Sequence, residues 1–314
     1  MGKAHAPRRG SMQYWPRKRS RHSLVRVRSW PINNQAKPLA FIGYKAGMTH
    51  VIATDNRSKA LTKGEDIALP TTIIDCPPII VAGLSFYLHS KKIAQILTEK
   101  PNKHLKKKIQ LPKNKSKAIP SEFDDVRLLV HTQPKLTPTG AKKPKLLEIA
   151  LGGKKEEKLT YAQEKLGQEI KINEVFESGN QIDAHGITTG KGFQGTVKRF
   201  GVMIRSHKAE KTKRGIGNLG AWTPKRVDFR VPQSGKMGYH LRTDFNKQIL
   251  KISDKPEEIN PKNGIQHYGK VKNSYLLLKG SVPGPKKRAL VLLPSIRPNK
   301  KTVKDAPDIT FISK

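Results

Sequence analysis

Residues 190–242 form a stretch that is too highly charged to fold by burying its own side chains. It holds thirteen Lys or Arg residues against two acids, together with nine glycines and five aromatic residues. Repulsion among so many cations expands a segment in water, whereas a polyanion neutralises the charges and releases counterions. Glycine lets the backbone approach a partner closely, and aromatic and arginine side chains offer stacking surfaces for bases. The stretch is therefore predicted to be a long loop that takes its shape from surrounding nucleic acid.

A solvated, flexible loop is the alternative, because blocks of like charge usually behave as disordered tails. Trp222 favours the nucleic-acid interpretation over this one. It lies between Gly220-Ala221 and Thr223-Pro224, and an exposed tryptophan at a turn of this kind suits insertion better than free solvent.

The composition of the whole chain points the same way. It has 314 residues, a formal net charge of +38, a pI near 10.3 and 35% hydrophobic residues. A net charge of this size indicates the kind of binding partner rather than the fold. Nucleic acid is the leading candidate for this partner, with an anionic membrane surface second. No run approaches the roughly 18 apolar residues of a membrane helix. The single cysteine, Cys76, is expected to be a small buried hydrophobe, which fits a reducing cytosol.

Residues 1–38 are predicted to be an extended basic arm. The segment carries ten Lys or Arg residues and no acid, and the first acid of the chain is Asp55. Pro, Gly and Arg in this mixture favour an arm that follows a phosphate backbone rather than a globular segment. The expected phosphate and stacking contacts are Arg8, Arg9, Arg17, Arg19, Arg26 and Arg28.

From Leu39 onward, short β-branched runs at turn-rich spacing favour a β-barrel over a helical bundle. Helices are expected at Lys91–Lys100, ended by Pro101, and at Lys155–Leu166, ended by Gly167. The expected strands are Leu39–Tyr44, Met48–Ala53 after a turn or bulge at Gly47, Ile67–Asp75, Ile79–Tyr87, Val126–His131, Leu146–Leu151, Ile170–Phe176, Gln181–Thr188, Lys247–Ile252, Tyr275–Lys279 and Ala289–Leu293.

Motifs of enzyme chemistry are weak. Gly190, Gly192 and Gly195 match the GxGxxG pattern, but a dinucleotide site needs a following helix and an acid about 20 residues on. Thr196–Phe200 does not resemble the start of such a helix. The ten histidines are scattered and the acids show no convergence. The sequence therefore predicts no cofactor, no metal site and no catalytic residue.

Several blocks carry a resemblance to a known family. They are PRRGS at 7–11, PRKR at 16–19, RSWP at 28–31, GYKAGMTH at 43–50, VRLLVHTQP at 126–134, TGKGFQGTVKRFG at 189–201, IGNLGAWTP at 216–224, GYHLRTDFNK at 238–247 and KGSVPGPKKR at 279–288. From end to end the chain resembles the archaeal-type family of large-subunit ribosomal protein three (L-three).

The resemblance implies a mainly β fold with an α/β insertion: a body similar to the β-barrel of translation factors, with an N-terminal arm and an internal loop that penetrate ribosomal RNA. The implied parts are an arm at 1–38, the first part of the barrel at 39–88, an inserted lobe at 89–167, barrel at 168–189, the RNA-penetrating extension at 190–246, barrel completion at 247–294 and a tail at 295–314.

The resemblance also implies a role and a set of contacts. The chain is expected to be a non-catalytic constituent of the cytoplasmic large ribosomal subunit that nucleates early assembly. Its expected partners are the ribosomal RNA and neighbouring ribosomal proteins, without a membrane or a homo-oligomer. Gly220 and Trp222 would form a loop tip near the peptidyl-transferase and aminoacyl-tRNA entry region. Lys213 stands where eukaryotic relatives carry a methylated histidine.

The full set of expected RNA-binding residues combines the arm with the internal loop. It comprises Arg8, Arg9, Trp15, Arg17, Lys18, Arg19, Arg26, Arg28, Lys191, Lys198, Arg199, His207, Lys208, Lys213, Arg214, Trp222, Lys225, Arg226, Lys236, His240 and Arg242. Two other hypotheses stay open at this point. An RNA-modifying or RNA-cleaving enzyme would show turnover that depends on one acid or histidine, and a DNA-packaging protein would prefer duplex DNA to folded ribosomal RNA.

Overall fold

A computed structural model describes residues 7–112 and 119–314. The chain divides into two units. The first, here called the extension, combines Met1–His22 with Ile187–Leu241; the second, the body, combines Ser23–Gly186 with Arg242–Lys314. Residues 1–6 of the expected arm and residues 113–118 of the expected inserted lobe lie outside the described residues.

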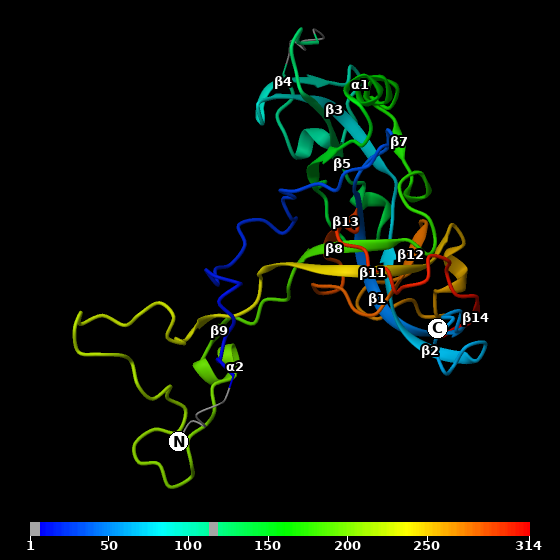
Figure 1. Cartoon of the computed structure of the whole chain (residues 1–314). Helices are drawn as coiled ribbons and strands as arrows, with labels where there is room; N and C mark the ends of the chain where they lie inside the picture. The colour runs from blue at the N-terminus through cyan, green and yellow to red at the C-terminus, as the bar shows by residue number, and fades with distance from the viewer. Residues whose placement is uncertain (1–6, 113–118) are drawn as a thin grey trace. The chain divides into compact units, whose positions relative to one another are not determined.

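The body is built mainly from strands, as the β-branched runs indicate (Figure 1). Seven strands form one sheet in the order β13-β8-β11-β12-β2-β1-β14, and β13 pairs in addition with β1, so the hydrogen-bonded order returns to β1. Their bounds are β1 Phe41–Thr54, β2 Asp66–Asp75, β8 Gln181–Ile187, β11 Leu241–Ser253, β12 Tyr275–Lys279, β13 Ala289–Pro294 and β14 Ile309–Ile312.

The buried face of this sheet forms the main core. Phe41, Ile42, Ile74 and Leu276 are fully buried, and so is the ring of Tyr275. Each such aliphatic side chain contributes about 1.5–3 kcal/mol relative to an exposed one. The strands are held in register by this burial, because a slip of one residue would turn every apolar side chain to the opposite face.

A second sheet has the order β4-β3-β5-β6, with β7 also pairing with β3. The bounds are β3 Ile79–Leu88, β4 Lys91–Leu97, β5 Asp125–His131, β6 Leu146–Ala150 and β7 Glu169–Ile170. Helix α1 (Lys155–Glu164) lies against β5, with Ala162 fully buried. Lys158 of α1 pairs with Asp125 of β5 at 2.9 Å. The described part of the body also contains short 3₁₀ turns, at Leu105–Lys107, Pro134–Leu136, Ile172–Glu174 and Pro256–Glu258.

Most expected elements are confirmed, and the expected irregularity at Gly47 is a β-bulge. The pairing of β1 with β2 shifts register between Lys45 and Gly47, and Ala46 is fully buried there. Cys76 is buried as well, and burial raises the pKa of its thiol, which opposes a nucleophilic role.

The prediction of a helix at Lys91–Lys100 is wrong. Residues Lys91–Leu97 form strand β4, which pairs antiparallel with β3. The two residues between the strands, His89 and Ser90, have φ of 46° and 64°. Two consecutive left-handed residues form the type I′ hairpin turn. The usual Asn-Gly signal is missing here, so the apolar positions alone were compatible with a helix.

Three further segments differ from the expectations. Of the strand expected at 170–176, only Ile170 belongs to a strand, as the second residue of β7, and a 3₁₀ turn follows at Ile172–Glu174. The long strand β11 begins at Leu241 rather than at Lys247. The polar tail contributes β14, which pairs with β1 through Val51 and Ile312.

Candidate nucleic-acid interface

Among the described residues of the extension, 7–22 and 187–241, regular structure is confined to the base of the loop. Strand β9 (Phe193–Gln194) pairs with β10 (Gly235–Lys236), and helix α2 spans Thr196–Phe200. The backbone between Gly201 and Ser234 contains neither helix nor strand, and Figure 1 draws it as open loops. The expectation of a long irregular loop is therefore confirmed for 201–234. The base, however, has a hydrogen-bonded structure of its own.

Helix α2 corrects one detail of the sequence analysis. Thr196–Phe200 does start a helix, which ends at Gly201 in the left-handed conformation (φ 70°). It is five residues long, and the strand before it, β9, pairs antiparallel. The arrangement thus lacks the parallel strand and long helix that a dinucleotide fold places beneath a pyrophosphate.

An aromatic cluster joins the arm to the base of the loop within the extension. The ring of Trp15 stacks on Phe200 with centroids 6.5 Å apart and meets Phe229 edge-on at 5.8 Å. The guanidinium of Arg17 lies 4.5 Å from the Phe200 centroid. Gly10 is required beside this ring, because a Cβ there would lie 2.4 Å from a Phe200 carbon. Trp15 and Arg17 thus take part in intramolecular packing.

Arg199 forms hydrogen bonds with the main chain of the extension itself. Its guanidinium donates hydrogen bonds to the carbonyls of Lys236 (3.1 Å), Gln233 (2.8 Å) and Arg17 (3.3 Å). These three bonds hold α2, the returning limb of the loop and the arm together. The planar fork of arginine suits several acceptors at once. Burial lowers the pKa of Arg199.

His240 has a similar positioning role. Its Nε2 accepts the N–H of Gly238 at 3.2 Å, so Nδ1 is the nitrogen that donates to the carbonyl of Lys18 at 3.0 Å. The N–H of Ser20 donates to the carbonyl of Tyr239 at 2.9 Å. The arm therefore follows the 238–240 segment through main-chain and imidazole contacts.

Most of the expected RNA-binding residues are solvent-exposed and none is buried. Trp15, Arg17, Arg199, His240 and Arg242 are half-buried. The exposed ones are Arg8, Arg9, Lys18, Arg19, Arg26, Arg28, Lys191, Lys198, His207, Lys208, Lys213, Arg214, Trp222, Lys225, Arg226 and Lys236. All belong to the extension except Arg26, Arg28 and Arg242, which belong to the body.

The extension has too few acids to neutralise its cations. Residues 7–22 and 187–241 contain eighteen Lys or Arg residues and two acids, Glu210 and Asp228. Asp228 forms an ion pair with Arg230 at 2.8 Å, and the hydrogen bonds from Arg230 hold the pKa of this carboxyl below its usual range. Most of the positive charge therefore has no internal counter-ion and is available to an external anion.

Trp222 is the most exposed tryptophan, with 84% of its surface accessible. Its carbonyl accepts the N–H of Lys225 at 2.7 Å, which closes a turn. Gly220, two residues earlier, has φ of 117°, a conformation that L-residues rarely adopt. Leu219 and Val227 nearby in sequence are also exposed. An apolar surface of this kind on a charged loop fits a partner that offers stacking surfaces.

Several residues that shape this unit are absent from the expected set of RNA-binding residues. Gly10, Phe193, Phe200, Gly238 and Tyr239 shape the base of the extension. Their roles depend on ring packing and on positive φ angles, and neither can be read from the order of residues. The one available signal was the alternation of aromatic residues with glycines along 190–242.

In the part of the chain that the structure describes, no cluster of three His, Cys, Asp or Glu residues has metal-binding geometry. None of the helices in this part combines the length and apolar character of a membrane span.

A mainly β body together with an exposed unit in which cations far outnumber acids is typical of a polyanion-binding protein. The model of the family "Ribosomal protein L3" matches residues 1–119 and 102–314, and the chain belongs to this family. It is similar to large ribosomal subunit protein uL3 of Methanobrevibacter smithii, at 44% identity over 100% of the chain and 98% of the relative. The same protein of Methanocaldococcus jannaschii is 44% identical over 98% and 96%. That of Archaeoglobus fulgidus is 41% identical over 99% and 98%.

Proposed function

We propose that the protein is a structural constituent of the large ribosomal subunit that binds the ribosomal RNA directly through its extension. The observation that carries this proposal is the surplus of exposed cations in the extension. Residues 7–22 and 187–241 hold eighteen Lys or Arg residues against two acids, and the loop between Gly201 and Ser234 has no helix or strand to hold it. Membership of the family, whose relatives are named as large-subunit proteins, supports the choice of RNA over DNA.

The proposal extends to the roles of the parts. The hydrogen-bonded order of the seven-stranded sheet supports a barrel body like that of translation factors. In this proposal the parts of the chain are an arm (1–38), barrel (39–88, 168–189 and 247–294), an inserted lobe (89–167), an RNA-penetrating internal segment (190–246) and a tail (295–314). Gly220 and Trp222 form the tip, near the peptidyl-transferase region. The role is structural, in early assembly and in support of that region, and the chemistry belongs to the RNA.

A salt titration tests the RNA-binding part. The full chain should bind large-subunit ribosomal RNA with an affinity that falls by about 10³–10⁵ between 50 and 200 mM salt, as expected for ~6–10 phosphate contacts. Chemical footprinting in the same samples locates the contacts on the RNA. An affinity that does not respond to salt, or a preference for duplex DNA of equal length, contradicts the proposal.

Trp222 provides the test of the tip. In ribosomes carrying Trp222→Ala we expect altered aminoacyl-tRNA accommodation or altered sensitivity to drugs that act near the catalytic centre. Trp222→Phe keeps a stacking ring, so ribosomes with this variant should retain most of the normal tRNA accommodation and drug sensitivity. Phe311→Ala, which removes a 54% exposed ring from β14, is the matched control. If tRNA accommodation, drug sensitivity and RNA protection are all unchanged in Trp222→Ala, the tip assignment is wrong.

A further inference from the structure

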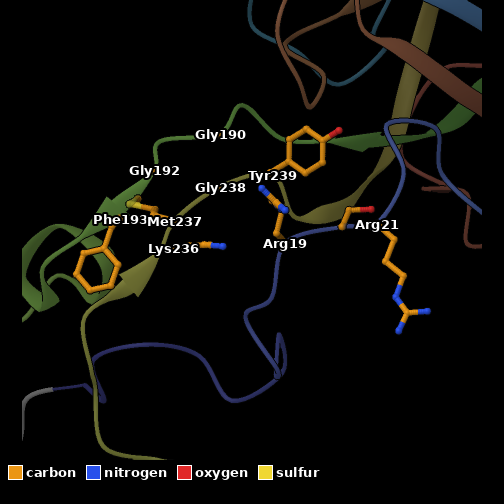
Figure 2. A pocket seen from close by; sticks show the side chains of 10 residues that line it. Arg19, Arg21, Gly190, Gly192, Phe193, Lys236, Met237, Gly238 and Tyr239 are labelled. Atoms are coloured by element: carbon orange, nitrogen blue, oxygen red, sulfur yellow. The ribbon is translucent and has the colours of Figure 1, made fainter.

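A cleft of about 530 Å³ lies within the extension, at the base of its loop. This volume falls within the ~300–1,000 Å³ typical of ligand pockets. Its walls come from the arm and from both limbs of the loop (Figure 2). The lining residues are Arg19, Ser20, Arg21, Gly190, Gly192, Phe193, Lys236, Met237, Gly238 and Tyr239.

Two kinds of group gather in this cleft. The first is cationic, and in the view of Figure 2 the Lys236 side chain lies between Phe193 and Arg19, whereas Arg21 points away from them. The second kind of group is aromatic. The ring of Phe193 is 71% exposed on one wall of the cleft, and Tyr239 lines another wall. Cations beside flat rings are the combination that binds a phosphate together with an unstacked base.

Glycines open the floor of the cleft to a ligand. Gly192 has φ of 66°, and a Cβ there would meet no atom within 4 Å. The backbone around it is nevertheless fixed, because the Gly192 carbonyl accepts the N–H of Met237 at 2.8 Å and the Lys191 N–H donates to the Met237 carbonyl at 2.9 Å. A ligand can therefore approach a rigid main chain without meeting a side chain.

The backbone of Tyr239 is strained. Its φ is 56°, an unusual value for a bulky residue, and Gly238 before it has φ of 77°. Gly238 cannot be replaced, because a Cβ would lie 2.1 Å from the Thr189 carbonyl oxygen. Strain of this kind persists where the surrounding structure imposes it, and it clusters at ligand sites. Here it turns the Tyr239 ring into the wall of the cleft.

We propose that this cleft binds a single RNA nucleotide that has been turned out of its helix. The base stacks on Phe193, with Tyr239 as the facing wall, and the phosphate pairs with Arg19 and Lys236. The proposal rests on the RNA-binding function above and assigns one part of that interface to a defined ligand unit. The flanking cations of the extension accommodate the neighbouring phosphates, which a free nucleotide does not have.

The test compares two RNA hairpins of identical stem, one with a single bulged adenosine and one fully paired. The full chain should bind the bulged hairpin about tenfold more tightly, which is within the range measured for stacking of one base. Phe193→Ala and Phe193→Leu should each remove this preference, and the leucine variant preserves apolar bulk should the alanine variant fold poorly. With 4-thiouridine in the bulge, photocrosslinks should map to the peptides that contain Phe193 or Tyr239.

Matched controls separate this preference from general charge effects. Lys236→Ala and Lys208→Ala each remove one exposed cation of the extension. Both should weaken binding to each hairpin, but only Lys236→Ala should reduce the ratio between them. Phe311→Ala should leave affinity and ratio unchanged.

Each contrary outcome has a distinct meaning. Equal, steeply salt-dependent binding of both hairpins overturns the cleft proposal and leaves the RNA-binding function intact. Salt-independent or undetectable binding of both hairpins overturns the function itself. A preference that survives in both Phe193 variants also overturns the assignment. Micromolar binding of adenosine monophosphate alone, with no preference between hairpins, identifies a free nucleotide as the ligand instead of RNA.

Discussion

Arg199→Lys separates the positioning role of Arg199 from a contribution of charge alone. The arginine donates to three carbonyls, those of Lys236, Gln233 and Arg17. Lysine retains the positive charge but replaces the planar fork with a single ammonium group. We expect this ammonium group to reach one of the three acceptors. The substitution therefore removes about two charge-assisted hydrogen bonds from the base of the extension.

The expected magnitude follows from the exposure of the site. A hydrogen bond to a charged group contributes about 1.5–3 kcal/mol when buried, and an ordinary one about 0.5–1.5 kcal/mol. Arg199 is half-buried, so two lost bonds should cost about 1–3 kcal/mol of local stability. This corresponds to an increase of about 5- to 150-fold in the opening of the β9–β10 pair.

Amide hydrogen exchange measures this opening. The N–H groups of Lys191 and Met237, which bond across the two limbs of the loop, should exchange faster in Arg199→Lys by that factor. Amides of the core strand β12 should be unaffected. Binding to ribosomal RNA should keep the same salt dependence, because the number of cations is unchanged. Unchanged exchange at Lys191 and Met237 would refute the positioning role, and a reduced salt slope would show that Arg199 contacts phosphate instead.

Two further predictions concern the body. Burial raises the pKa of Asp75, whose oxygens accept from Tyr268 (2.7 Å) and Asn273 (3.0 Å). Its stabilising neutral form is fully present below the unfolded pKa of about 3.9 and is lost as pH rises through the raised native pKa. Asp75→Asn should therefore gain stability relative to the unsubstituted chain in denaturant titrations as the pH rises above about 4, and a stability difference that does not change with pH would oppose this. Replacing His89-Ser90 by Asn-Gly should stabilise the β3–β4 hairpin by about 0.4–1 kcal/mol; a lower denaturation midpoint would contradict the type I′ turn.

The charge and the strand pattern were accessible from the sequence. The excess of cations along 190–242 follows from composition alone, because charge depends little on fold. Most strands of the body were also found, since β-branched runs bounded by proline and glycine are local signals. The exposure of Trp222 followed from its place between Gly220 and Pro224.

The tertiary structure decided what depends on distant partners or on left-handed backbone. The pairing of β13 with β1 and the addition of β14 join segments far apart in the chain, and no local pattern indicates which strands become neighbours. The turn at His89-Ser90 and the strained Tyr239 need positive φ values, which their residue types do not favour. The positioning role of Arg199 likewise depends on three main-chain carbonyls, which only the fold brings within hydrogen-bond distance of its guanidinium. The sequence alone therefore determined that this chain has the charge of a polyanion-binding protein. Long-range packing determined which of its cations are exposed to an external anion.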